Sequence, residues 1–305
     1  MQRTLSTAVI VGLLAATAAA FAITERLKLT KSPISATKIV HEYVSPRAHT
    51  KAVIAIRFRR ADHVTVTIRD SHRHEVNTLA FRVLVRPQRR VFSWDGRTDA
   101  ATQAPDGTYR MEVHFESQHR TILIPNPIVL ESQLPAVLDA GVTPKTFSPD
   151  GDGQFDHVTI HYKLSEEAHV LVSVDGQRVI RSRSRKEKDK VTWDGTVHGH
   201  ALAAGTYTLT VGAVDLAGNV AEKVQHVSFT IRYIALGAKR VRVHAGSVLR
   251  IGVATDAKRY RWKLNGRSGS ASRAVLKLRA PRTRGTYRLV VTEHGHAAAT
   301  TVVVR

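Results

Sequence analysis

The sequence predicts an all-β protein, built of tandem β-sandwich modules behind one amino-terminal transmembrane or signal helix. Three observations predict it: short alternating Val, Ile and Thr runs separated by Asp-Gly or Asn-Gly turns, an internal repeat with aromatic landmarks, and one long apolar segment at the start. Alternating runs of this kind form half-buried antiparallel strands, and many of them at short intervals are typical of sandwiches. The 305 residues suffice for two or three modules, each with its own core.

The amino-terminal segment is uncharged and apolar from Leu5 to Ile23. A helix of that length spans about 28 Å, close to the thickness of a bilayer's hydrocarbon core. Small residues around Ala20 also fit a signal-peptide cleavage site, so an uncleaved anchor and a removed signal both stay open. On either interpretation, residues 1–24 carry the rest of the chain out of the cytoplasm, and residues 25–37 form a polar stalk.

An internal repeat sets the architecture of the remainder. Each copy runs from a Ser-Pro pair through two strand-like runs to a Trp-Asp-Gly turn and then a Gly-Thr-Tyr strand. The separation from Trp to Tyr is 15 residues in one copy (94 to 109) and 14 in the other (193 to 207). A third, poorer copy keeps the Gly-Thr-Tyr strand, at Tyr287. The repeat predicts three modules, at 38–131, 132–232 and 233–305.

The aromatic landmarks suit a structural role. A strand Trp beside a tight turn supplies a large buried anchor between two sheets. A Tyr that follows Gly-Thr places its ring inward and leaves its hydroxyl free to bond the backbone, as in a tyrosine corner. We therefore expect five aromatic residues to hold the modules together: Trp94, Tyr109, Trp193, Tyr207 and Tyr287.

The motifs together resemble one known family. The start Phe147-Ser148-Pro149-Asp150-Gly151-Asp152-Gly153, with the Trp-Asp-Gly turn and the Gly-Thr-Tyr strand, is similar to the bacterial immunoglobulin-like (Ig-like) module of the flagellar hook-capping protein family. The resemblance is good over 140–232, fair over 38–131 and weak over 233–305. It implies Ig-like sandwiches used for spacing, assembly or attachment, without catalysis. Nothing resembles the hook-binding segment of that family.

One acidic loop could bind a metal ion. Asp150, Asp152 and Asp156 alternate around Gln154, a spacing that can wrap a hard cation such as calcium through oxygen. The alternative is a Gly-rich turn whose Asp side chains bond local amides. The first copy keeps the position, at residues 45–51, but has no carboxylate there, so the fold itself does not require the acidic residues.

Positive charge is concentrated at the carboxyl end. The chain has 46 Lys and Arg against 25 Asp and Glu, a net charge of +21. Residues 233–305 hold 16 of the basic residues and 2 acidic ones, Asp256 and Glu293, which gives 16 − 2 = +14. On its strands the cations alternate with apolar and aromatic side chains, so we expect the cations to lie outside and the aromatics in the core. The seven selected cations, our candidates for binding an anionic ligand, are Arg240, Arg242, Arg259, Arg261, Lys263, Lys277 and Arg279.

The sequence favours a non-enzymatic protein. It has no Cys, so disulfides and thiolate chemistry are excluded, and no nucleophile elbow, phosphate-binding loop or histidine metal motif occurs. We expect a membrane-anchored or secreted surface protein whose basic module binds an anionic envelope polymer or, less favoured, an acidic protein. Nucleic acid ranks third, because a basic face without exposed aromatics lacks stacking platforms. The alternatives are an assembly factor of a surface appendage and an accessory subunit of a secreted enzyme.

Overall fold

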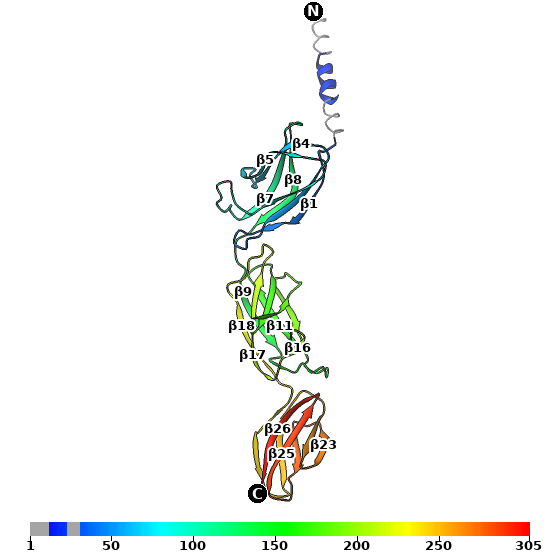
Figure 1. Cartoon of the computed structure of the whole chain (residues 1–305), viewed down its shortest axis with the longest axis vertical. Helices are drawn as coiled ribbons and strands as arrows, with labels where there is room; N and C mark the ends of the chain where they lie inside the picture. The colour runs from blue at the N-terminus through cyan, green and yellow to red at the C-terminus, as the bar shows by residue number, and fades with distance from the viewer. Residues whose placement is uncertain (1–11, 23–30) are drawn as a thin grey trace, which may run out of the picture. The chain divides into compact units, whose positions relative to one another are not determined.

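The computed structural model describes residues 12–22 and 31–305, and it contains one helix followed by β-strands (Figure 1). The helix covers residues 12–22. Within the described part of the chain, no helix has the length and hydrophobicity needed to cross a bilayer. The rest of the predicted span, and residues 25–30 of the predicted stalk, lie outside the described residues. The first strand begins at Ile34, inside the segment 25–37 that the sequence suggests to be a stalk.

The all-β sandwich prediction is confirmed. The chain divides into two compact units, 1–132 and 133–305, and the described strands enclose three separate hydrophobic cores. The first core draws on residues 34–130, the second on 137–233 and the third on 249–304. The second and third cores lie in the same compact unit.

The first sandwich packs a five-stranded sheet, in the order β2-β8-β7-β4-β5, against a three-stranded sheet, β1-β3-β6. Its strands are β1 (Ile34–His41), β2 (Tyr43–Val44), β3 (Ala52–Phe58), β4 (Asp62–Arg69), β5 (Glu75–Val85), β6 (Arg89–Trp94), β7 (Gly107–Phe115) and β8 (Arg120–Leu130).

The second sandwich has the same plan, with sheets β10-β18-β17-β12-β13 and β14-β11-β9, and a short β15-β16 hairpin. Its strands are β9 (Val137–Thr143), β10 (Thr146–Phe147), β11 (Val158–Leu164), β12 (His169–Val174), β13 (Gln177–Arg181), β14 (Lys188–Trp193), β15 (Thr196–Val197), β16 (His200–Ala201), β17 (Gly205–Val214) and β18 (Gln225–Ile231).

The third sandwich repeats the plan once more, with sheets β20-β26-β25-β22-β23 and β19-β21-β24. Its strands are β19 (Ala235–Leu236), β20 (Arg240–Val243), β21 (Val248–Ala254), β22 (Tyr260–Leu264), β23 (Arg267–Ala271), β24 (Val275–Arg279), β25 (Gly285–Glu293) and β26 (His296–Val304). In every module, a short early strand (β2, β10 or β20) pairs in parallel with the last strand. The weak third copy therefore has the complete strand order of the other two.

Alternation along the strands explains why they form sandwiches. In β11 the side chains of Val158, Ile160, Tyr162 and Leu164 are buried, while those between them are less covered. Successive strand residues point to opposite faces, so one face of each sheet enters the core and the other meets solvent. The three Gly-Thr-Tyr motifs all begin a long strand at the glycine: β7, β17 and β25.

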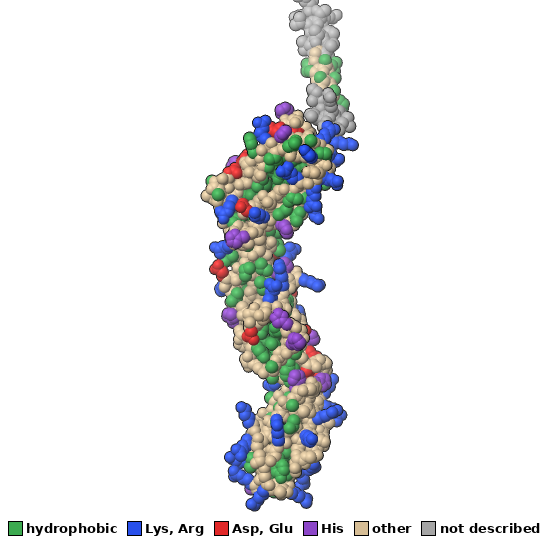
Figure 2. Space-filling model, viewed as in Figure 1, with side chains coloured by type: hydrophobic (Ala, Val, Ile, Leu, Met, Phe, Trp, Pro, Cys, Tyr) green, Lys and Arg blue, Asp and Glu red, His purple; other side chains and the backbone are tan. Residues whose placement is uncertain are grey.

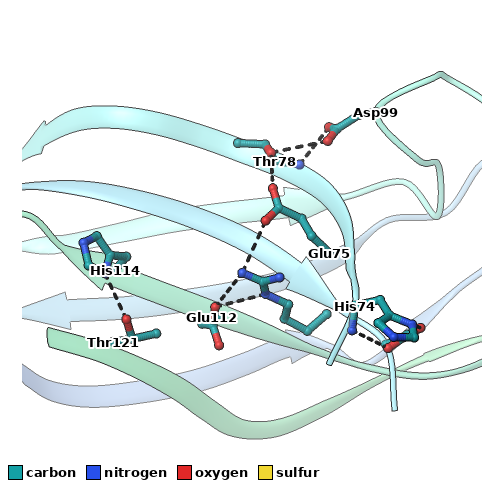
Figure 3. A network of polar contacts seen from close by, with 9 residues as sticks. His74, Glu75, Thr78, Asp99, Glu112, His114 and Thr121 are labelled. Atoms are coloured by element: carbon teal, nitrogen blue, oxygen red, sulfur yellow. Dashed lines mark hydrogen bonds and ion pairs between the residues drawn. The ribbon is translucent and has the colours of Figure 1, made fainter. Parts of the chain in front are cut away.

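The outer face of the first module's large sheet carries a polar network (Figure 3). Arg69 on β4 donates from Nη2 to Glu112 on β7 at 2.9 Å and to Glu75 on β5 at 3.3 Å. Thr78 on β5 then links Glu75 to Asp99, through contacts of 2.9 Å and 2.8 Å. These bonds tie the edge strand β5 to its neighbours, and we assign the network a structural role.

Candidate functional site

The Trp-Asp-Gly turns lie where the sheets meet. Trp94 and Trp193 are 1% and 4% exposed, and each indole nitrogen donates to a carbonyl three residues on, Arg97 at 2.7 Å and Thr196 at 3.0 Å. The Gly of each turn has positive φ, +80° at Gly96 and +71° at Gly195. Added Cβ atoms there would meet the Ser-Pro proline of the same module, at 2.9 Å and 2.8 Å. The Ser-Pro pair and the Trp-Asp-Gly turn of each of these two modules are therefore packed against one another.

All three Gly-Thr-Tyr strands form the same tyrosine corner. The hydroxyl of each Tyr donates to the carbonyl four residues earlier: Tyr109 to Pro105 at 2.5 Å, Tyr207 to Ala203 at 2.9 Å, and Tyr287 to Thr283 at 2.9 Å. Tyr109 is buried, and the other two rings pack against the edges of their cores. The bond recurs in the third module, where sequence similarity is weakest.

The acidic loop at 150–156 is held by its own side chains. The carboxylate of Asp156 accepts from the amides of Gly151 and Gly153, both at 2.8 Å, and Asp152 accepts from the amide of Gln154 at 2.6 Å. One oxygen of each of Asp150, Asp152 and Asp156 lies within 4.8 Å of the others. Asp156 thus positions the loop, because both of its oxygens are engaged by amides, while Asp150 keeps a buried oxygen with no hydrogen-bond partner.

Two further carboxylates meet this loop from the third module. Asp256 follows β21 and accepts a short hydrogen bond from the hydroxyl of Ser148. Glu293 ends β25, and it shares a group of mutually close ligand atoms with Asp150 and His294. Its side chain is 0% exposed. We call the four side chains that converge here the junction carboxylates: Asp150, Asp152, Asp256 and Glu293.

The electrostatics of the junction disfavour negative charge. Burial raises the pKa of Glu293 to about 8, and the charges of Asp150, Asp152 and Asp256 act in the same direction. Burial also raises the pKa of Asp256, despite its hydrogen bond from Ser148. Next to the cluster, the ring of Tyr233 stacks on His296, with centroids 3.6 Å apart. This stack and the Ser148–Asp256 bond connect the second sandwich to the third.

The sequence predicted two of the four junction carboxylates, Asp150 and Asp152. Sequence reasoning selected Asp150, Asp152 and Asp156 from their spacing, but it did not connect Asp256 and Glu293 to them, because those residues are about 100 and 140 positions away. A signal was present: these are the only two acidic residues in a segment with 16 basic ones. Only folding shows that both lie beside the acidic loop of the second module.

The seven selected cations are all exposed, but they do not share one surface. Arg240, Arg242, Arg261 and Lys263 lie on the five-stranded sheet of the third module, and Arg259 directly precedes it. Lys277 and Arg279 lie on β24 of the other sheet. The fold therefore divides the set between the two outer faces of the sandwich.

The larger basic face includes a cation that sequence reasoning left out. Arg288 on β25 is opposite Thr301 on β26, which is opposite Arg240 on β20, so these three side chains form a row across the sheet. Figure 2 shows blue Lys and Arg side chains spread over the visible face of this module. Tyr260 is buried and Trp262 packs against the core, so neither ring offers an exposed stacking platform.

Comparison with known proteins agrees with this architecture. Residues 49–118 match the family model of the FlgD Ig-like domain, and residues 150–232 match that of the bacterial Ig-like domain. The chain contains tandem Ig-like modules. The FlgD model falls in the first module, whereas the sequence landmarks were closest to that family over 140–232. No curated protein matches the chain.

Several solved structures are similar to this chain at low TM-scores. The I-band fragment I67–I69 of titin is 12% identical and covers 90% of this chain and 99% of its own, with a TM-score of 0.31. FlgD from P. aeruginosa is 18% identical over 32% of this chain and 78% of its own, with a TM-score of 0.24. The D0–D1 domain of intimin is 10% identical over 64% and 98%, with a TM-score of 0.27. No conclusion about fold or function is drawn from scores this low.

Proposed function

We propose that this chain is a non-enzymatic surface protein whose Ig-like modules act as spacers and whose basic third module binds an anionic polymer of the cell envelope. The observation that carries the proposal is the charge of that module, +14, with the selected cations exposed on both sheets. Cations displayed on flat sheet faces attract a charged polymer along its backbone and need no shaped pocket. In this proposal the apolar amino-terminal segment is a membrane anchor or an export signal.

The polar composition of the larger basic face supports a polymer ligand. Thr286 and Thr292 on β25 and Ser268 and Ser270 on β23 alternate with the cations or stand opposite them. Hydroxyl donors beside guanidinium groups suit phosphate or carboxylate oxygens. Since the aromatic side chains of β22 face inward, the face suits charge attraction more than base stacking, which favours a wall polymer over nucleic acid.

Binding by charge predicts a specific response to salt. The full chain, kept soluble in a neutral detergent, should be retained on immobilised poly(glycerol phosphate) at about 0.05 M salt and pass through uncharged dextran. Retention should be lost by about 0.5 M salt, because the Debye length falls to a few Å. Absence of retention at low salt would refute the proposal.

Two matched triple variants locate the binding face. One replaces Arg240, Arg261 and Lys263 by Gln, and the other replaces Arg250, Lys277 and Arg279 by Gln, so both remove three positive charges. We expect the first variant to lose more affinity and to show a flatter dependence on salt, since contacts to the polymer determine that slope. Equal losses would mean that net charge, and not the larger face, governs retention.

The match of the first module to the FlgD Ig-like domain favours a second candidate, an assembly factor of a surface appendage. In that role, the modules would bind a protein partner through shape and apolar contact. A pull-down from envelope extract separates the candidates: a single protein partner that survives about 0.5 M salt supports assembly, while polymer released by salt supports adhesion.

A further inference from the structure

Within residues 12–22 and 31–305, no Lys or Arg forms an ion pair with any of the four junction carboxylates. Arg259 and Arg261 line a pocket beside Glu293 without pairing with it. The Nδ1 atom of His294 lies 3.9 Å from Glu293 Oε1, on a side chain that is 53% exposed.

The unpartnered oxygens gather at this one place. In the part of the chain that the structure describes, four buried carboxylate oxygens have no hydrogen-bond partner: Asp150 Oδ2, Asp256 Oδ1, Glu293 Oε1 and Glu293 Oε2. A buried carboxylate without a partner costs several kcal/mol unless it is neutralised or coordinated. The third module has 16 cations, yet both of its acidic side chains lie at the junction. Ion pairs elsewhere on its surface would avoid the cost of burying these carboxylates without a partner.

We propose that the junction carboxylates bind a calcium ion, which joins the second module to the third. The ligands would come from the acidic loop before β11 and from the end of β25, where Asp150 and Glu293 have mutually close ligand atoms. Asp256, between β21 and β22, would add a third carboxylate, since its charge acts on Glu293. A calcium ion takes six to eight oxygen ligands in flexible geometry, which suits carboxylates from separate loops. Magnesium demands a small octahedral site and keeps its water, so it fits this set less well.

Calcium accounts for features that a turn alone leaves unexplained. Asx turns within the acidic loop explain the bonds of Asp152 and Asp156 but not why Asp150 and the buried Glu293 lie close together. A bound divalent ion would offset both the burial and the carboxylate repulsion that raise the pKa of Glu293. It would also add a link between two modules that share the Tyr233–His296 stack and the Ser148–Asp256 hydrogen bond.

The first test is calorimetric titration of the metal-free full chain with calcium chloride. We expect one ion per chain, with a dissociation constant of about 10⁻³ M or tighter, the range of extracellular calcium modules. Glu293→Gln should weaken binding at least ~10-fold. The matched control is Asp175→Asn, an exposed carboxylate in a hairpin turn of the same unit with φ of +48°, a conformation that Asn tolerates. That variant should bind within about twofold of the wild type.

A second measurement keeps the proposal testable if the variant perturbs folding. With a chelator present at about pH 9, above the raised pKa of Glu293, Glu293→Gln should melt at a higher temperature than the wild type, because it removes a buried charge that has no ion-pair partner. With calcium at saturating concentration the order should reverse, because only the wild type gains the ion. Hydrogen exchange should slow at residues 148–157 in the wild type alone.

Three outcomes would overturn the proposal. The first is no calcium binding by the wild type up to about 10 mM, and the second is unchanged binding by Glu293→Gln. The third is a chain that binds zinc but not calcium and that loses zinc binding in the His294→Ala variant. The titration involves no polymer, so its result is independent of the salt-dependent adhesion proposed above.

Discussion

Replacing Gly195 by Ala tests the contact between the Trp-Asp-Gly turn and the Ser-Pro pair of the second module. Gly195 has φ of +71°, and a Cβ there would lie 2.8 Å from Cγ of Pro149 and 2.9 Å from Cε2 of Phe147. Both neighbours resist movement, since the proline ring is rigid and Phe147 is 1% exposed in the second core. We expect Gly195→Ala to destabilise the second module selectively.

The expected loss combines two costs. A non-glycine residue in the left-handed region costs about 1–2 kcal/mol. Forcing a methyl group into a packed site costs about 1–3 kcal/mol more. A total of about 3 kcal/mol corresponds to roughly 12–24 °C in the melting temperature of a module of this size.

Gly199→Ala is the matched control for the strain. Gly199 lies in the β15–β16 hairpin of the same module with φ of +79°, and a Cβ there would meet nothing within 4 Å. It should therefore incur the conformational cost alone. Thermal unfolding of the full chain, followed by hydrogen exchange of peptides from 137–231, would measure each loss and assign it to the module. If the two variants cost the same within about 0.5 kcal/mol, the packing of the Ser-Pro segment on the turn does not stabilise the fold.

Two further predictions concern single polar groups. Tyr207→Phe removes the corner hydrogen bond to Ala203 and should lower the free energy of unfolding by about 1 kcal/mol in a urea titration; a loss below about 0.3 kcal/mol would assign the corner to packing alone. Burial of Asp62 would raise its pKa, but hydrogen bonds from the Ser117 amide and Gln118 outweigh it and hold the pKa below its usual value. Because the pKa is lower in the folded state, this stabilisation is complete above about pH 4 and is lost as the pH falls through the folded-state pKa. Asp62→Asn should therefore be less stable than the wild type at pH 7, and the difference should shrink in acid; a constant difference from pH 7 to pH 2 would show that ionisation of Asp62 is unimportant.

Much of the fold could be predicted because its signals are local. The runs at 52–58 and 158–164 coincide with β3 and β11, and each Gly-Thr-Tyr motif starts a strand at its glycine. Alternation of side chains and turn chemistry act over a few residues, so they can be read without knowledge of distant partners. The third module was harder to recognise, because it lacks the Trp-Asp-Gly turn. Its Trp262 lies on β22, which has the sheet position of β4 and β12, and not on the strand that carries Trp94 or Trp193.

The sequence by itself determined the repeat, the strands, the structural aromatic residues and the excess of positive charge in the last module. Tertiary structure decided what those residues do together. It divided the seven selected cations between two faces, added Arg288 to the larger one, and brought Asp256 and Glu293 to a loop more than 100 residues earlier. The physical reason is that sheet pairing and module contact bring together residues with no local relation in sequence. That arrangement decides whether a buried carboxylate lies beside a cation or beside other carboxylates.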